Sequence, residues 1–415
     1  MRALIGPALA NSTTRILLAC FVACALVATV APVSAQREAK NPTAAKQQTK
    51  KNVPAKKPAR DAKPEVPPAR TTFSAEDERV AVFPGIPEAR VWGDSEREFE
   101  RLLPKLSGPW LILSGGGADG AYGAGLISGW TEAGDRPEFA VVTGVSTGAA
   151  IAAFAFLGPR HDADLHKNFT TVTAADVFSS GGTEEALFDT WPLKRLIEKQ
   201  VTAELLAEIA AEHRRGRRLL VVTTNLDTGR PVVWNLGAIA VQGGDRALKL
   251  FHQVLLASSA IPGLFPPVYI DAEANGRKFQ EMHADGTITG PLYVAPSSML
   301  SPGPGATRLP ASALYIIVNG KLSPYFLMPE RERAYILSRG LGVALQFGLR
   351  AMVFYTYAAT RRLGIGYHLA FLSPDFDYPS RGAFDPEYMK ALFEHGFVTG
   401  KNAGAFRNSP PDFNP

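Results

Sequence analysis

Short apolar runs alternate with segments of helical periodicity along most of the chain, beginning near Val80. The runs 110–113 and 139–143 are predicted as buried strands, because they are short, apolar and bounded by turn-forming residues. Glycine-rich turns follow both runs. The segments 121–133 and 148–156, after those turns, are predicted as helices.

The rest of the chain continues this alternation. Further strands are predicted at 219–223, 232–235 and 315–318, and further helices at 192–211, 247–258 and 331–361. Strands that alternate with helices are typical of a mostly parallel sheet with helices on both faces. We therefore predict a three-layer α/β/α fold, and no internal repeat is visible.

The segment 325–357 is rich in large apolar residues with several arginines among them. As a helix it would form either a lid or lipid-facing surface, or part of the core. The core interpretation is favoured, because apolar helices are more often buried.

Residues 1–35 have the layout of a secretory signal, with Arg2 and Arg15 before or at the start of an apolar run that ends at Val33. We expect cleavage after Ala35, although the run is long enough for an uncleaved anchor. The protein is then expected to be exported to the periplasm, to the cell envelope or out of the cell.

The 2 cysteines, Cys20 and Cys24, both lie in that apolar run. A chain cut after Ala35 would therefore contain no disulfide. Lipidation of Cys20 is an alternative, but the sequence stays apolar after it, where a lipidated N-terminus would turn polar.

Residues 36–70 carry 10 basic and 3 acidic residues and almost no large apolar ones, so they cannot bury enough surface to fold. We predict a spacer at 36–74, a folded domain at 75–405 and a tail at 406–415. The +5 charge of the chain comes from the N-terminal segments, and the rest is net acidic, so nucleic-acid binding is not indicated. The basic spacer is either solvated or attached to an anionic membrane surface.

The sequence Gly144-Val145-Ser146-Thr147-Gly148 stands between a predicted strand and a predicted helix. A nucleophile elbow needs small residues two positions to either side of the serine, because the backbone approaches closely there. Ser146 is therefore a candidate nucleophile near a helix N-terminus.

A second glycine motif, containing Gly115, Gly116, Gly117 and Gly120, also lies between a strand and a helix. Backbone N–H groups without side chains around them can stabilise an oxyanion. The letters also fit a dinucleotide-binding loop, but the next strand runs into Ser146 instead of ending in an acidic residue.

A third motif is Asp285-Gly286, downstream of a turn-forming segment near Asn275. By itself this dipeptide is typical of a solvated turn. His283 and Asp285 are spaced as two metal ligands would be, but no second cluster accompanies them, so we expect no metal and no cofactor.

In this order, the three motifs and the run from Ala257 to Pro267 resemble the patatin-like phospholipases over residues 109–295. The resemblance implies that Ser146 is the nucleophile, that Asp285 is its base, and that Gly115, Gly116, Gly117 and Gly120 form the oxyanion loop. Gly144, Gly148 and Gly286 complete the motifs. Asp119 stands where the family usually has a basic residue, which leaves the headgroup preference open, and Thr287 replaces a glycine or alanine.

The implied reaction is hydrolysis of a phospholipid or another lipid ester through an acyl-enzyme. A carboxylate is a weak base unless its surroundings raise its pKa, so Asp285 is expected to be buried. Two alternatives stay open: a carboxylesterase with a Ser-His-Asp triad, which would use His368 or His395, and a catalytically silent lipid-binding envelope protein.

Overall fold

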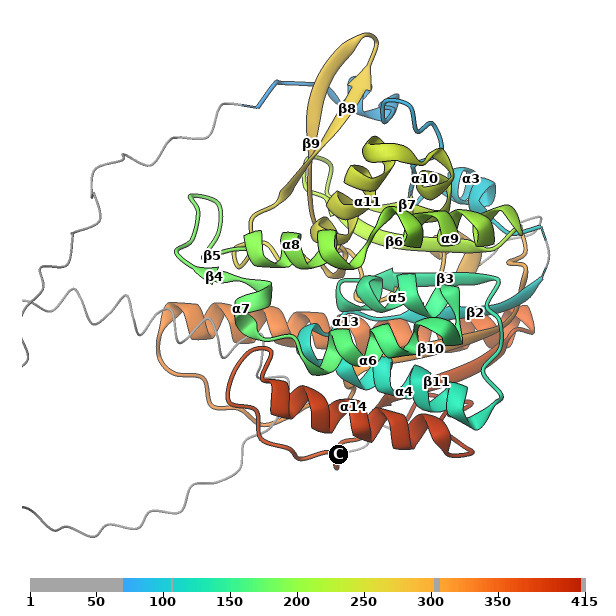
Figure 1. Ribbon diagram of the computed structural model, residues 1–415, viewed down its shortest axis with the longest axis vertical. Coiled ribbons are helices and arrows are strands. Elements are labelled where there is room, and N and C mark those ends of the chain that lie inside the picture. The colour runs from blue at the N-terminus through green and yellow to red at the C-terminus, as the bar shows by residue number, and fades with distance from the viewer. Residues whose placement is uncertain (1–69, 106, 302–306, 412–415) are drawn as a thin grey trace, which may run out of the picture.

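A computed structural model describes residues 70–411, apart from 106 and 302–306 (Figure 1). The predicted signal at 1–35, the spacer up to residue 69 and the end of the predicted tail lie outside the described residues. The domain predicted from residue 75 onward lies almost entirely within them.

A nine-stranded sheet forms the centre of the molecule. Its strands are β1 (Arg90–Trp92), β2 (Gly108–Leu113), β3 (Val141–Val145), β6 (Arg218–Asn225), β7 (Arg230–Asn235), β8 (Val268–Ala274), β9 (Arg277–Asp285), β10 (Ala311–Lys321) and β11 (Gly366–Leu372). The main order is β1-β7-β6-β3-β2-β10-β11, and the run from β6 to β11 is parallel. β1, β7 and the β8–β9 hairpin are antiparallel additions, and β4 (Ser179–Ser180) pairs separately with β5 (Phe188–Asp189). The predicted α/β fold with a mostly parallel sheet is confirmed.

Alternate residues of the central strands point to opposite faces of the sheet and enter two different cores. In β2, Leu111 and Leu113 join one core, whereas Trp110 and Ile112 join the other. The first core is covered by α4 (Gly120–Ala133), α5 (Thr147–Leu157), α6 (Asp162–Thr170), α9 (Ala203–Arg214), α10 (Leu236–Gln242), α11 (Gly244–Ser258) and α14 (Pro386–Lys401). The second is covered by α3 (Glu96–Phe99), α12 (Ser297–Leu300) and α13 (Arg333–Leu363).

Short helices complete the chain: α2 (Ala75–Arg79), α7 (Ala174–Val177), η1 (Glu100–Leu102), η2 (Gly117–Asp119), η3 (Pro159–His161) and η4 (Gly286–Ile288). The helix predicted at 192–211 is two helices, α8 (Trp191–Gln200) and α9. They separate at Val201 and Thr202, and the Thr202 hydroxyl accepts a hydrogen bond from the Leu205 N–H. A threonine in extended conformation with this bond is a helix N-cap, so the single-helix prediction was wrong at this point.

The helices α4 and α14 pack unusually closely through four glycines. A Cβ atom on Gly125 or Gly129 would lie 2.0 Å from a carbonyl oxygen of α14. On α14, a Cβ atom on Gly396 or Gly400 would lie 2.2 or 2.1 Å from a carbonyl oxygen of α4. Side-chain-free positions on both helices therefore set the distance between them.

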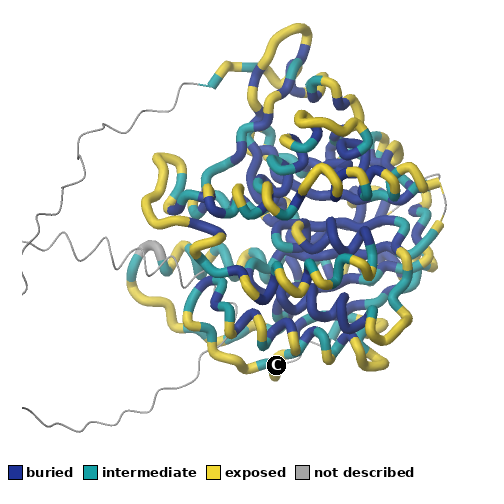
Figure 2. Tube along the Cα trace, viewed as in Figure 1, coloured by how far each residue is buried: buried dark blue, intermediate teal, exposed yellow. Residues whose placement is uncertain are grey.

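The favoured core interpretation of 325–357 is wrong for one side of this segment. Phe326 is 83% exposed, Ile336 57% and Phe347 55%, although Leu349 and Val353 are buried. Most of α13 is exposed or intermediate in Figure 2, and its described buried residues begin only at Leu349. The periodicity identified a helix correctly, but it did not reveal how little of its circumference packs on the sheet.

Candidate active site

Strand register brings the ends of β3 and β9 to the same edge of β6. The last residue of β3, Val145, pairs with Val222 of β6. The next residue of β6, Thr223, pairs with Asp285 at the end of β9. Ser146, which follows Val145, and Asp285 therefore leave the sheet side by side, although 139 positions separate them in the sequence.

The local backbone at Ser146 is strained. Its φ of 54° and ψ of −126° lie in a region that non-glycine residues rarely occupy. A Cβ atom on Gly144 would lie 2.4 Å from the Gly148 carbonyl oxygen, and one on Gly148 would lie 2.5 Å from the carbonyl oxygen of Leu113. Both positions must be glycine, because neighbouring backbone atoms lie too close for a side chain. This is the requirement of a sharp strand-to-helix turn.

Ser258 holds this turn in place from α11. Its hydroxyl accepts a hydrogen bond from the Ser146 N–H at 2.9 Å and donates one to the Val222 carbonyl at 2.8 Å. The Ser146 N–H is therefore occupied and is not a free oxyanion donor. The sequence signal for Ser258 was its place in the family-like run from Ala257 to Pro267, which assigned it no role.

The carboxyl group of Asp285 is fully buried. Its Oδ1 accepts a hydrogen bond from the Thr287 N–H at 2.8 Å. Burial raises the pKa of Asp285 to about 6, and the Thr287 N–H and the hydroxyls of Ser146 and Thr287 offset part of that rise. The burial that a catalytic carboxylate requires is present.

The second carboxyl oxygen, Asp285 Oδ2, forms no well-aligned hydrogen bond with a described residue. The Ser146 hydroxyl is nevertheless close enough to stabilise the charged carboxylate. Ser146 and Asp285 are thus neighbours whose contact is loose in this conformation. Catalytic hydrogen bonds are often long before substrate binds and shorten in the reacting complex.

The glycine loop lies next to Ser146, and its four glycines differ in what their N–H groups do. The Gly115 N–H donates to the Pro291 carbonyl, and the Gly120 N–H donates back into η2. The N–H groups of Gly116 and Gly117 have no backbone partner among the described residues. Gly117, with a φ of 57°, faces open space, so these two N–H groups are the available donors.

Asn319, at the carboxyl end of β10, holds the loop from the other side. Its side-chain amide donates to the Ser114 carbonyl at 2.7 Å, and its own N–H donates to the Ser114 hydroxyl at 2.9 Å. A Cβ atom on Gly116 would lie 2.2 Å from the Asn319 carbonyl oxygen. Sequence analysis missed Asn319, because the only signal was its position after a predicted strand.

Asp119 is buried and accepts a hydrogen bond from the Tyr388 hydroxyl of α14 at 2.8 Å. Burial raises the pKa of Asp119 to about 6, whereas Tyr388 and the charge of Lys321 oppose that rise. Lys321 lines the cavity beside the loop. Its Nζ donates to the Pro374 and Phe376 carbonyls at 3.1 and 2.7 Å, and sequence analysis did not identify this residue.

None of the seven histidines lines the cavity that contains Ser146. His368 stacks on Tyr315, and His395 packs against Phe376. His283 is fully buried between Thr223 and Glu281. His368 and His395, one of which a triad would need, therefore pack against aromatic rings outside the cavity that contains Ser146.

The cavity over Ser146 has a volume of about 1220 Å³. Ser146, Gly116 and Gly117 lie at its polar end. Most of the remaining wall is apolar and comes from α5, α7, α8, α11 and the N-terminal half of α13. Such a site accommodates a long apolar ligand with one polar group near the serine.

The chain was compared with protein families, curated sequences and solved structures. A family model described as patatin-like phospholipase matches residues 111–295. No curated protein sequence matches the chain. Among solved structures, the crystal structure of VipD from Legionella pneumophila is similar at 12% identity and a TM-score of 0.30, over 72% of this chain and 67% of that one.

Proposed function

We propose that this chain hydrolyses carboxylic esters of lipids with a Ser146–Asp285 dyad, and the match of residues 111–295 to the patatin-like phospholipase model supports the proposal. The observation that carries the proposal is the strand register that sets Asp285 beside Ser146. The burial of the Asp285 carboxyl and its raised pKa support its role as a base.

The reaction follows from the positions of these groups. The Ser146 hydroxyl attacks the ester carbonyl carbon, and its proton passes to the Asp285 carboxylate. The N–H groups of Gly116 and Gly117 stabilise the tetrahedral oxyanion. As the intermediate collapses, the same proton passes to the leaving alcohol oxygen. Water, deprotonated by Asp285, then attacks the acyl-enzyme, and Asp285 returns that proton to the Ser146 oxygen as the carboxylic acid leaves.

Because most of the cavity wall is apolar, we propose that the cavity binds a long acyl chain of the substrate. Phospholipids are preferred over neutral glycerides in this proposal on the basis of the family model. We also propose that the protein is exported, on the basis of residues 1–35, and that residues 36–69 attach it electrostatically to anionic surfaces.

The dyad is tested by comparing Asp285→Asn with His368→Gln and His395→Gln on a panel of phospholipids, lysolipids and short acyl esters. We expect turnover to fall by about 10³-fold or more in Asp285→Asn, as in other hydrolases that lose a catalytic base, and to stay within about threefold in the histidine variants. Loss of turnover in either histidine variant, with Asp285→Asn still active, would support a triad instead.

The alternative of a catalytically silent lipid-binding protein predicts an unreactive serine. We expect an organophosphonate to label Ser146 in the unmodified protein and to leave Ser146→Ala unlabelled. If Ser146 is labelled but no ester in the panel is cleaved, the substrate class is wrong. If Ser146 is not labelled at all, the enzyme proposed above is wrong.

A further inference from the structure

The exposed side of α13 is a continuous apolar stripe. We define the outer stripe of α13 by its exposed positions, which recur every three or four residues: Ile336, Leu337, Gly340, Ala344, Phe347, Ala351, Phe354, Tyr355 and Ala358. None of them is charged. In the segment just before the helix, Phe326 and Met328 are also exposed, at 83% and 77%. Contiguous exposed apolar surface of this kind is typical of an interaction site.

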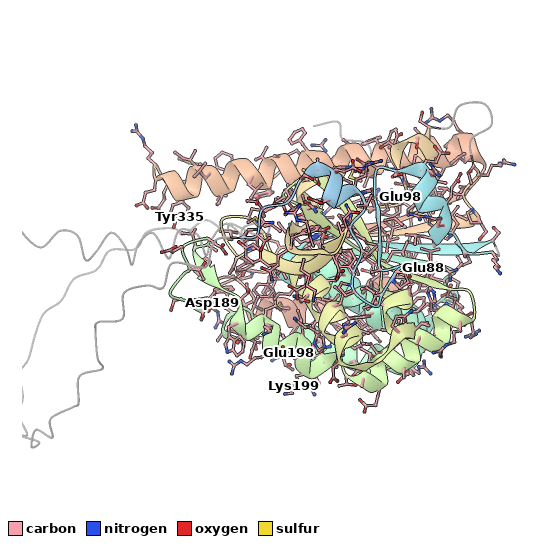
Figure 3. All side chains as sticks on the ribbon, turned by 90° about the horizontal axis from the view of Figure 1, so that it is seen from above. Glu88, Glu98, Asp189, Glu198, Lys199 and Tyr335 are labelled. Atoms are coloured by element: carbon pink, nitrogen blue, oxygen red, sulfur yellow. The ribbon has the colours of Figure 1, made fainter. Side chains whose placement is uncertain are left out.

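The opposite side of the same helix lines the cavity over Ser146. Ser338, Leu341, Leu345 and Leu349 contribute to its wall, and Leu337, at the edge of the outer stripe, also reaches it. One helix therefore separates the cavity from the outer stripe. Figure 3 shows α13, with Tyr335 labelled near its N-terminal end, along the side of the molecule opposite α8, where Glu198 is labelled.

The charges of α13 are of one sign. Residues 333–363 contain five arginines and no acidic residue. Arg361 and Arg362 form the last turn, beyond the end of the outer stripe, and both are exposed. An apolar stripe that ends in two exposed arginines matches the interface of a bilayer, where the apolar side chains enter the acyl region and the guanidinium groups meet phosphates.

We propose that the outer stripe of α13, together with Phe326 and Met328, docks the enzyme on a phospholipid bilayer, with the helix lying in the plane of the interface. The proposal rests on the lipid hydrolase function proposed above and deepens it. A substrate that leaves the bilayer would then have to pass only one helix to reach the cavity containing Ser146.

The helix lies on the membrane in this proposal and does not cross it. The span Tyr335–Leu363 is long and apolar enough to cross a membrane by length and composition. Its inner side, however, holds polar contacts with the domain: Gln346 donates to the Lys321 and Ser323 carbonyls, and Arg339 donates to the Tyr325 carbonyl. A crossing helix would break these contacts and remove one wall of the cavity.

A second copy of the chain is a less suitable occupant. Two α13 helices packed through their outer stripes would bring the exposed Arg361 and Arg362 of each copy to the interface, with no acidic residue of either helix to pair with them. An anionic or zwitterionic lipid surface provides phosphate groups for these charges, and a second α13 does not.

Insertion can be measured at a single site. A chain beginning at Gln36, the proposed processed form, contains no cysteine, so Phe347→Cys and Val398→Cys each carry one environment-sensitive fluorophore. Val398, on α14 across the sheet, is 57% exposed and Phe347 is 55% exposed. With neutral phosphatidylcholine vesicles we expect a blue shift for the label at 347 and none at 398. Equal shifts, or no shift at 347, would overturn the proposal.

Loss of binding is tested with Phe326→Ser, Ile336→Asn and Phe347→Ser combined, and Val398→Asn serves as the matched control. We expect co-sedimentation with phosphatidylcholine vesicles to weaken by at least about tenfold only in the triple variant, because three apolar side chains no longer enter the bilayer. Hydrolysis of a soluble short-chain ester should not change. Unchanged vesicle binding in the triple variant would contradict the docking surface.

Three further outcomes separate the remaining possibilities. A dimer that the triple substitution converts to a monomer, with no change in vesicle binding, would identify a second copy as the occupant. Binding that resists alkaline extraction would indicate a crossing helix. If vesicle binding depends on the outer stripe but no ester is cleaved, docking is correct and the proposed function is wrong. If esters are cleaved but vesicle binding does not depend on the stripe, only the docking proposal is wrong.

Discussion

At the residue scale, the proposed chemistry depends on one carboxyl group, that of Asp285, which burial makes difficult to ionise. Asp285 is fully buried, and among residues 70–411 as described, its carboxylate accepts a hydrogen bond of 2.8 Å from the Thr287 N–H. A catalytic base must be deprotonated near the working pH and still bind a proton, and a pKa of about 6 satisfies both needs.

This pKa predicts the pH dependence of the reaction. Because the base is the deprotonated form of Asp285, kcat/KM is expected to rise with pH through about 6 and to level off above it. The measurement is kcat/KM for a neutral, soluble ester from pH 4 to 8. Asp119→Asn is the control, because Asp119 is the other buried carboxyl with a pKa of about 6, and the inflection should persist without it. A profile that is flat between pH 5 and 7 would exclude Asp285 as the base.

At the element scale, the contact between α4 and α14 fixes the helix that starts at the glycine loop. Gly120, the first residue of α4, belongs to the candidate oxyanion motif, and Tyr388 of α14 donates to Asp119 just before it. The close glycine packing therefore aligns the loop as well as the two helices. A change in the separation of the helices should be transmitted to the site.

Gly129→Ala tests this packing. The new methyl group would lie 2.0 Å from the Phe397 carbonyl oxygen, so the helices must separate, and we expect a loss of about 1–3 kcal/mol in the free energy of unfolding. Urea denaturation measures it. The matched control is Gly340→Ala on α13, which meets nothing within 4 Å and should stabilise the protein by about 0.4–1 kcal/mol. Equal effects of the two substitutions would show that the helices do not constrain each other.

At the scale of the whole molecule, the buried carboxylates needed at the site reduce stability. The folded-state pKa of Asp285 is raised from 3.8 to about 6, so the folded protein binds its proton more tightly than the unfolded chain does. Stability from this group is therefore greatest below pH 4 and is lost as pH rises through 6. The rise corresponds to about 3 kcal/mol for a fully buried group.

Asp285→Asn should accordingly raise the melting temperature while it abolishes activity. The difference from the unmodified protein is expected to be largest at pH 8, where the buried carboxylate is charged, and to vanish near pH 4, where it is neutral. Thermal unfolding at a series of pH values measures it. A variant that is less stable than the original protein at pH 8 would show that the Thr287 and Ser146 contacts outweigh the cost of burial.

The sequence by itself determined the features that depend on neighbouring residues. The strand-turn-helix around Ser146 needs small residues at Gly144 and Gly148, and local sterics make that pattern readable without a structure. The alternation of strands and helices fixed the fold class in the same way. The order of the three motifs indicated that Asp285 and Ser146 act in one site, but it did not indicate which strands bring them together.

Only the tertiary structure decided what depends on residues far apart in the chain. Register on β6 brings Asp285 to Ser146, and the Pro291 carbonyl removes Gly115 from the free donors. Ser258 and Asn319 act through hydrogen bonds to residues that are more than 100 positions away in the sequence, Ser146 and Ser114. A single sequence has no signal for such contacts. The exposure of α13 was undetermined for the same reason: periodicity defines the apolar side of a helix, but only packing decides whether protein or solvent covers it.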